Sequence, residues 1–198
     1  MDIKERKLEI LTAAGALLSE RGIGGLTTKN LAMKVGFAES ALYRHYSSKE
    51  EIIAALLQYL HGVISERLAA VNSSQSEPAG ERLRLLFKSQ LEFHCDNPHF
   101  LTAVFSEGFL AYSPSVNAGI LQLISLMRDT IGGIVVDGQR DGVFTNDVPA
   151  AELTHILLGS FRLLMLRWHI SGLSFDVKAE GQKHVNSLIS LISKNNAT

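Results

Sequence analysis

The stretch TTKNLAMKVGFAESALYRHYSSKEEI, residues Thr27–Ile52, contains two short helical patterns separated by one glycine. Either of its opening threonines can cap a first helix, which is expected to end at Val35. Gly36 is expected to end this helix and turn the chain, as glycine commonly does after a helix. A second helix is predicted over Ala38–His45. Two short helices joined by a tight turn are the outline of a helix-turn-helix, whose second helix enters the major groove of DNA.

Apolar residues recur on one side of both short helices. The 3.6-residue period of a helix places Leu31, Ala32 and Val35 on the inner side of the first helix. Leu42 and Tyr46 are expected to face the same core from the second helix. Because Ala32 is small, it lets the two helices cross closely.

The outward side of the same segment is polar and positively charged. Between residues 27 and 49 the chain has four basic residues and one acid, while the net charge of the whole chain is -1. The overall balance argues against a protein that binds nucleic acid with its entire surface, but it allows a local basic patch. The side chains expected to point to solvent are Glu39, Ser40, Tyr43 and Arg44.

Two features of the segment predict phosphate binding. The N-terminus of the first helix offers free backbone N–H groups next to the Thr28 hydroxyl. Lys49 lies in the first turn of the following helix, where a cation is unfavourable beside the positive end of the helix dipole. A DNA phosphate bound at these helix ends would account for both features.

Several side chains carry donors suited to the edges of bases. Lys29, Ser40 and Arg44 can donate there, and arginine is best suited to guanine. Tyr43 can bond a phosphate or pack its ring on a thymine methyl group. In the plainer alternative, Tyr43 and His45 are boundary residues of a small core, and Lys29 is a solvated helix charge.

This segment resembles the N-terminal domain of the TetR family of bacterial transcriptional repressors. The resemblance covers the chain up to about residue 60, and many spaced positions agree with the pattern of the family. Phe37 and Tyr46 replace the usual Val and Phe, and both keep an apolar body. The matching positions are Thr27-Thr28, Leu31-Ala32, Val35-Gly36-Phe37, Leu42-Tyr43-Arg44-His45-Tyr46 and Ser48-Lys49.

The resemblance implies a homodimer whose two reading helices enter successive major grooves of a palindromic double-stranded operator. Half-sites about 34 Å apart, or a multiple of that distance, would fit such a dimer. It also implies roles by position. Phosphates would be held by Thr28 and Lys49, bases would be approached by Lys29, Ser40 and Arg44, and the DNA backbone by Tyr43 and His45.

Helical periodicity continues along the rest of the chain, so an all-α fold is predicted. An N-terminal three-helix helix-turn-helix DNA-binding domain is placed at residues 1–50, followed by a linking helix over about 47–70. The polar segment Asn72–Gly80 marks the boundary, and residues 71–198 form a larger helical domain for ligand binding and dimerisation. The other expected helices are Ile3–Glu20, Ala79–Cys95, one within Pro98–Leu110, Ser115–Gln139, Pro149–Ile170 and Asp176–Lys194.

The segment Pro149–Ile170 is too apolar for a lone surface helix. It is either a buried core helix or, as the layout of the family implies, part of a dimer interface formed with the last helix. The predicted interface residues are Leu153, Ile156, Leu157, Ser160, Phe161, Leu164, Trp168, Val185, Leu188 and Ile189.

Aromatic and methionine side chains gather in the C-terminal part. At helical spacing such side chains usually form plain core, but relatives in the family sense ligands between their helices. The same residues could line a pocket for a small apolar ligand. The predicted pocket residues are Phe87, Phe93, Phe105, Phe109, Met127, Phe161 and Met165.

The run HCDNPH, residues His94–His99, combines metal-ligating residue types at a spacing unlike that of zinc motifs. His94 and Cys95 are adjacent on a helix and diverge, and Pro98 breaks the segment. No metal and no cofactor are therefore expected. The chain has no GxSxG, P-loop or GxGxxG motif, so an all-α enzyme is the least favoured class.

The composition predicts a cytoplasmic protein with no membrane partner, and the resemblance to the TetR family implies a bacterial, nucleoid-associated one. The single cysteine, Cys95, cannot form an intrachain disulfide, which fits a reducing compartment. The charged start of the chain lacks the apolar region of a signal peptide. No apolar run is expected to span a membrane.

Two functions remain open at this point. The first is a ligand-responsive DNA-binding repressor. The second is a DNA-binding protein whose C-terminal domain binds a protein partner, as in the nucleoid-occlusion branch of the family, which the SALYRHY run at residues 40–46 resembles.

Overall fold

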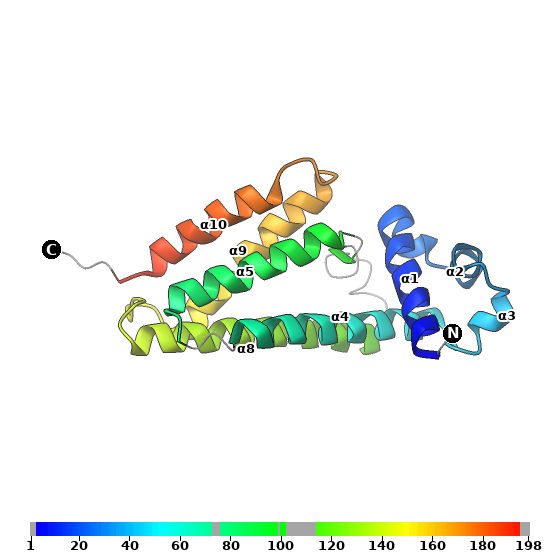
Figure 1. Cartoon of the computed structure of the whole chain (residues 1–198), viewed down its shortest axis with the longest axis horizontal. Coiled ribbons are helices and arrows are strands. Elements are labelled where there is room, and N and C mark those ends of the chain that lie inside the picture. The colour runs from blue at the N-terminus through cyan, green and yellow to red at the C-terminus, as the bar shows by residue number, and fades with distance from the viewer. Residues whose placement is uncertain (1–2, 73–75, 99, 102–113, 195–198) are drawn as a thin grey trace. The chain divides into compact units, whose positions relative to one another are not determined.

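The structure, a computed structural model, describes residues 3–72, 76–98, 100–101 and 114–194. Over these ranges the fold is all-α, as predicted, with eight helices and no strand (Figure 1). One isolated bridge pairs Phe144 with Ser193. The chain forms two compact units, the first from Met1–Gly62 with Asn97–Leu123 and the second from Val63–Asp96 with Ile124–Thr198.

The first unit begins with α1 (Ile3–Gly25), which is kinked at Gly22. The backbone of Gly22 has a φ of 62°, a conformation that glycine adopts at little cost. The sequence placed a helix end near this glycine, whereas the structure adds one more helical turn after the kink. Ile10 and Leu18 of α1 are fully buried and form part of the core of the unit.

Helix α2 (Thr28–Val35) begins and ends where the sequence predicts. The Thr27 side chain accepts a hydrogen bond from the Asn30 backbone N–H at 3.1 Å, which satisfies a free donor of the first turn. Gly36 has a φ of 74°, and the next N–H, that of Phe37, donates to the Ala32 carbonyl at 2.8 Å. This left-handed glycine ends α2 and turns the chain toward the next helix.

Helix α3 (Glu39–Leu42) is shorter than the predicted Ala38–His45. The residues after Leu42 continue as hydrogen-bonded turns, in which the His45 N–H donates to the Leu42 carbonyl at 2.9 Å. This tighter spacing is common where a helix ends. Leu42 and Tyr46, which were predicted to face inward, are buried. Ser40, Tyr43 and Arg44, which were predicted to face solvent, are exposed.

Helix α4 (Lys49–Asn72) starts with a capping arrangement of serine and glutamate side chains. The Ser48 hydroxyl accepts a hydrogen bond from the Glu51 N–H at 3.2 Å. In return, the Glu51 carboxylate accepts from the Ser47 N–H at 2.6 Å and from the Ser47 hydroxyl at 2.7 Å. These bonds satisfy donors that the first turn of a helix leaves free.

The second unit contains α5 (Ala79–Asp96), most of α8 (Pro114–Arg140), α9 (Ala150–Ile170) and α10 (Val177–Ile192). Helices α5 and α10 run antiparallel, since Gly80 lies near Ile189 at one end and Gly181 near Leu91 at the other. A Cβ atom on Gly181 would lie 2.7 Å from the Leu91 side chain. Glycine at this position therefore permits the close packing of the two helices.

Two contacts hold other helices of the second unit together. The rings of Phe87 on α5 and Phe161 on α9 lie with their centroids 4.9 Å apart. The Arg82 guanidinium on α5 donates to the Asp137 carboxylate on α8 at 2.8 Å. That hydrogen bond is the main reason why the pKa of Asp137 lies below its usual value.

By length and composition alone, α8 could cross a membrane, and among the described helices it is the one that could. The core helix of a soluble protein passes the same test. Arg128 and Asp129 lie exposed near the middle of α8.

Most of the helix predicted within Pro98–Leu110 falls outside the described residues.

Candidate nucleic-acid interface

The start of α2 and the start of α3 meet through side chains. The Thr28 hydroxyl donates a hydrogen bond to the Glu39 carboxylate, with 2.5 Å between the oxygens. The Tyr43 hydroxyl in turn donates to the Thr28 oxygen at 3.5 Å. Thr28, Glu39 and Tyr43 therefore form one exposed polar cluster at the N-terminus of α2.

The outward face of this region presents the side chains that the sequence predicts there. Ser40, Tyr43 and Arg44 are exposed on and just after α3, and Lys29 is exposed in the first turn of α2. Tyr43 leaves 52% of its surface in solvent, which is high for an aromatic residue. Of the other predicted DNA contacts, Thr28, His45 and Lys49 are partly buried.

Buried residues on the opposite side hold α3 in place. Leu42 is fully buried and Tyr46 is 5% exposed, as the sequence predicts for the inner face. Burial raises the pKa of Tyr46, and the nearby charge of Glu51 adds to this effect. Because these two side chains fix the inner face of α3, its outer face has a defined orientation.

The positive charge of the face is concentrated on fewer residues than the sequence suggests. Lys34 forms an ion pair with Glu20, with 2.5 Å between nitrogen and oxygen, and this contact lowers the pKa of Glu20. Within the part of the chain that the structure describes, Lys29 and Arg44 form no ion pair. The charges of these two side chains are therefore available to a ligand.

Each helix N-terminus predicted to bind a phosphate already holds a carboxylate. Glu39 accepts from Thr28 at the start of α2, and Glu51 accepts from Ser47 at the start of α4. The hydrogen bonds from Ser47 keep the pKa of Glu51 below its usual value. Sequence reasoning treated Glu39 only as a first-turn acid of its own helix, since its partner is 11 residues away.

The predicted ligand-pocket residues that the structure describes all lie in the second unit. Phe87, Phe93, Phe161 and Met165 are buried, and Met127 is partly buried. Of these, the rings of Phe87 and Phe161 are in contact. The remaining two predicted residues, Phe105 and Phe109, lie outside the described residues.

Besides Arg82, α5 has two buried polar residues that sequence reasoning missed. Gln90 is 2% exposed and His94 is 7% exposed, although both residue types are usually found at the surface. The signal was available as two polar residues, four positions apart, in an otherwise apolar stripe. Sequence reasoning considered His94 only as a possible metal ligand. The described residues contain no cluster of three His, Cys, Asp or Glu that could hold a metal ion, and His99 lies outside them.

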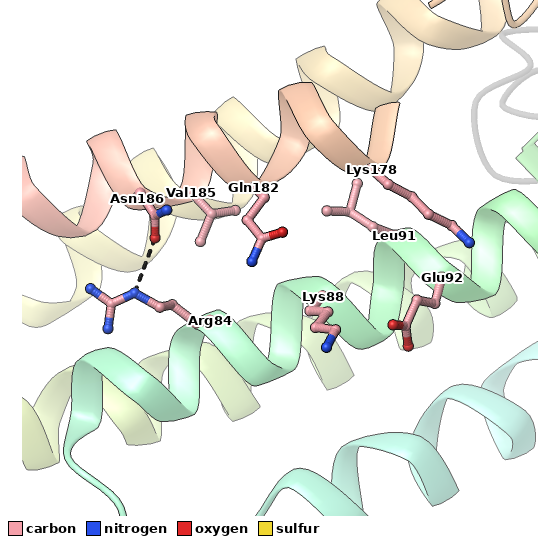
Figure 2. Close-up of a pocket in the computed structure, with 8 residues that line it drawn as sticks. All are labelled: Arg84, Lys88, Leu91, Glu92, Lys178, Gln182, Val185 and Asn186. Carbon is pink, nitrogen blue, oxygen red and sulfur yellow. Dashed lines mark hydrogen bonds between the residues drawn. The ribbon is translucent and has the colours of Figure 1, made fainter. Parts of the chain in front are cut away.

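A shallow groove lies between α5 and α10, on the outer side of α5 (Figure 2). Its volume is about 140 Å³, well below the 300 Å³ or more typical of ligand pockets. Long charged side chains form its rim, and one of them, Arg84, donates to the Asn186 side chain at 3.0 Å. The residues that line it are Arg84, Lys88, Leu91, Glu92, Lys178, Gln182, Val185 and Asn186.

Most of the predicted dimer-interface side chains are covered by their own chain. Among them, Ile156 is 51% exposed and Ser160 is partly buried, with its hydroxyl 3.0 Å from the His184 ring. A covered side chain gains little further contact from a partner copy, so its role is to support a neighbouring surface. The covered residues are Leu153, Leu157, Phe161, Leu164, Trp168, Val185, Leu188 and Ile189.

Three large apolar side chains on α9 are exposed, and one of them, Ile156, belongs to the predicted interface. Ile156, Leu163 and Ile170 are 51%, 65% and 75% exposed, and they recur at every seventh residue. This spacing places them on one face of the helix, as in the seam of paired helices. We call these three residues the α9 stripe.

Two family descriptions match the chain. Residues 10–56 match the family described as "Bacterial regulatory proteins, tetR family". Residues 76–170 match "Tetracyclin repressor-like, C-terminal domain".

The individual related proteins share only a low sequence identity with the chain. The chain is 27% identical to the nucleoid occlusion factor SlmA of Pasteurella multocida, over 80% of this chain and 82% of that protein. It is 24% identical to the transcriptional repressor KstR2 of Mycobacterium tuberculosis, over 97% of this chain and 95% of that protein. Among solved structures, the regulator FadR of Bacillus subtilis, in complex with stearoyl-CoA, shares the fold with a TM-score of 0.82 and 18% identity, covering 93% of this chain and 98% of FadR.

Proposed function

Because the chain belongs to the TetR family of bacterial regulatory proteins, we propose that it is a repressor that binds a palindromic operator as a homodimer. In this proposal the homodimer dissociates from the operator when a small molecule binds to the protein. Its function as a DNA-binding transcriptional regulator follows from the family. In this proposal residues 1–50 bind DNA, residues 71–198 dimerise and bind the small molecule, and the protein works in the cytoplasm.

The observation that carries the proposal is the two-sided character of α3 together with the hydrogen-bonded turns that follow it. Leu42 and Tyr46 fix its inner side, while Ser40, Tyr43 and Arg44 stand exposed on its outer side. A rigid helix with exposed donors is what reading of base edges in a major groove requires.

We assign two kinds of contact to this face. Lys29, Ser40 and Arg44 approach base edges, where Arg44 pairs best with guanine. The DNA backbone is contacted by the second group, which comprises Thr28, Tyr43, His45 and Lys49. For Thr28 to donate to a phosphate, its hydroxyl must leave the Glu39 carboxylate, so binding exchanges one anion for another.

For the homodimer we propose the α9 stripe as the contact between two copies. Three large apolar side chains exposed at a seven-residue spacing are costly in water and pack well against the same stripe of a second copy. A two-fold arrangement uses the same surface on both copies and would bring two reading helices to the two halves of a palindrome.

The release step follows from differential binding. A small molecule that binds better to the conformation that cannot engage both half-sites shifts the dimer away from the operator. The buried aromatic residues of the second unit are the proposed place for that molecule. The FadR structure that shares this fold is a complex with stearoyl-CoA, which supports a search for ligands of the present chain in this unit.

A gel-shift titration tests the proposal, with DNA from the intergenic region upstream of the gene and random DNA of equal length. We expect the upstream fragment to bind at least 100-fold more tightly at physiological salt, within the usual range for specific binding. Equal affinity for both fragments at every salt concentration would contradict sequence-specific binding. A single bound species containing one chain would contradict the homodimer.

The relationship to SlmA supports a second candidate, in which the C-terminal domain binds a protein instead of a small molecule. This candidate keeps the same DNA-binding face and replaces only the releasing partner. The two candidates can be distinguished by a pull-down experiment with a purified protein of the cell-division machinery from the same organism. Binding that depends on the second unit, without any effect of small molecules on DNA affinity, would favour this candidate.

A further inference from the structure

Helix α5 has a polar pair in the C-terminal half of its buried face. Gln90 and His94 are one helical turn apart, so their side chains emerge on the same side of the helix. They are 2% and 7% exposed. The neighbouring positions of this face, Leu83 and Phe87, are apolar and fully buried.

Both side chains have a polar atom without a hydrogen-bond partner among the residues that the structure describes. These atoms are Nε2 of Gln90 and Nδ1 of His94, and both are shielded from solvent. Buried polar atoms in folded proteins are almost always paired, and an unpaired one lowers stability. Two such atoms on adjacent turns of one face therefore call for a partner beyond the described residues, and a bound small molecule can supply it.

Aromatic rings and one charged side chain, Arg67, lie near the pair. On α5, the Phe93 ring lies 5.3 Å from the His94 ring, and Phe87 contacts Phe161 of α9. Burial lowers the pKa of His94 to about 4, and the nearby charge of Arg67 adds to this effect. The imidazole is therefore neutral at physiological pH, and its Nδ1 atom can either donate or accept a hydrogen bond.

We propose that Gln90 and His94 form a polar anchor for a single carbonyl or hydroxyl group on an otherwise apolar ligand. A ligand carbonyl accepts from the Gln90 amide and from a protonated Nδ1 of His94. A ligand hydroxyl accepts from the Gln90 amide and donates to an unprotonated Nδ1. This inference rests on the proposed release by a small molecule, and it names the chemical class of that molecule.

The anchor is separate from the groove between α5 and α10. Lys88, Leu91 and Glu92 of α5 are among the residues that line that groove, and Leu91 points toward α10 (Figure 2), whereas Gln90 lies on the buried face of the same helix. Charged side chains form the rim of the groove, whereas aromatic rings lie near the anchor, with Arg67 as its charged neighbour. A substitution at Lys88 is therefore a matched control, since it changes α5 at a neighbouring turn and leaves the anchor intact.

Three probes of nearly the same shape test the proposal: acetophenone, 1-phenylethanol and ethylbenzene. They differ only in carrying a carbonyl, a hydroxyl or neither group. Titration calorimetry on the full chain, without DNA, gives their affinities. We expect acetophenone and 1-phenylethanol to bind about tenfold more tightly than ethylbenzene, the size of effect that one or two buried hydrogen bonds give.

The variant Gln90→Leu/His94→Leu should bind all three probes with equal affinity, while Lys88→Gln should keep the tenfold preference. Without any probe, the double variant should melt at the same temperature as the wild type or higher, since it removes two unpaired polar groups. Equal affinities in the wild type, a preference that survives in the double variant, no binding of any probe, or a melting temperature lower by several degrees would each overturn the proposal.

This test separates the anchor from the proposed regulator function because no operator is needed. If the probes show the expected preference but never weaken DNA binding, the anchor stands and the release step fails. If the protein binds its operator but shows no preference among the probes, the DNA-binding proposal stands and the anchor fails.

Discussion

The two units place their candidate functional side chains in opposite environments. In the first unit Ser40, Tyr43 and Arg44 lie on the outside of a short helix whose inner side is fixed. In the second unit Gln90 and His94 lie inside, on a helix whose outer side faces solvent. A long polymer such as DNA must be met at the surface, whereas a small apolar molecule can be enclosed. In our proposals, DNA and a ligand are therefore recognised by different side chains in different units.

The largest expected effect concerns the exposed apolar surface of the second unit. Leu163→Glu should weaken dimerisation about 1,000-fold, because the two-fold contact would bury one unpaired carboxylate from each copy. Analytical ultracentrifugation measures the dissociation constant. Leu121→Glu is a matched control, since Leu121 is 62% exposed on α8 and lies outside the α9 stripe. Dimerisation that is weakened equally in both variants, or unchanged in both, would contradict the assignment of the α9 stripe to the dimer contact.

The next effect tests whether the second unit depends on its buried polar contacts. Asp137→Ala should lower the free energy of unfolding by about 3 kcal/mol, because it leaves the buried Arg82 guanidinium without its partner. Asp129→Ala on the same helix removes an exposed ion pair with Arg128 and should change stability by less than about 0.5 kcal/mol. Urea denaturation measures both. Similar losses in the two variants would show that burial of Arg82 does not matter.

The exposed face of the first unit should respond in affinity and leave stability unchanged. Arg44→Ala should weaken binding to the operator by about 2 kcal/mol and relax the preference at one base pair. Fluorescence anisotropy on the operator and on its point variants measures this effect, and the melting temperature serves as the control. A uniform loss on all sequences would move Arg44 from base reading to phosphate contact.

A pH titration tests the buried environment of His94 in the second unit. The folded pKa of His94 is about 4 and its ordinary value is 6.5, so between these values the unfolded chain takes up a proton that the folded chain does not. Stability should therefore fall as pH decreases, by about 1 kcal/mol between pH 6.5 and 5.5. His94→Leu should remove this part of the pH dependence, and substitution of the exposed His155 should not. Urea denaturation at both pH values checks the expectation.

The smallest expected effect lies at the start of α2. Glu39→Gln should tighten DNA binding about threefold at low salt, because it removes a negative charge beside a phosphate site and weakens the hold on the Thr28 hydroxyl. Anisotropy at two salt concentrations measures the change. Glu9→Gln on α1 controls for the change in net charge. Weaker binding by Glu39→Gln would mean that Glu39 positions Thr28 for DNA instead of competing for it.

Local signals made much of the first unit predictable. The cap at Thr27, the turn at Gly36 and the capping of α4 depend on residues within five positions of each other. The burial of Leu42 and Tyr46 follows from the helical period alone. The contact between Thr28 and Glu39 joins separate helices, and the period of neither helix contains that information.

The second unit was less predictable because packing decides which side of an apolar helix is covered. The sequence of α9 is apolar around most of its circumference, so its period could not separate the covered Leu157 from the exposed Leu163. On α5, the apolar pattern drew attention to Phe87, while the burial of Gln90 and His94 became clear only from their surroundings. Polar residues inside an apolar stripe break the local rule, which is where a function is expected.

Selection of bound DNA from a random pool tests the central claim most directly, namely that the outer face of α3 reads DNA sequence. The wild-type chain should enrich a palindrome with half-sites about 34 Å apart, or a multiple of that distance. Arg44→Ala should enrich a motif that has lost its preference at the position contacted by that residue. A wild-type chain that enriches no motif, or an Arg44→Ala variant that enriches the unchanged motif, would contradict the claim.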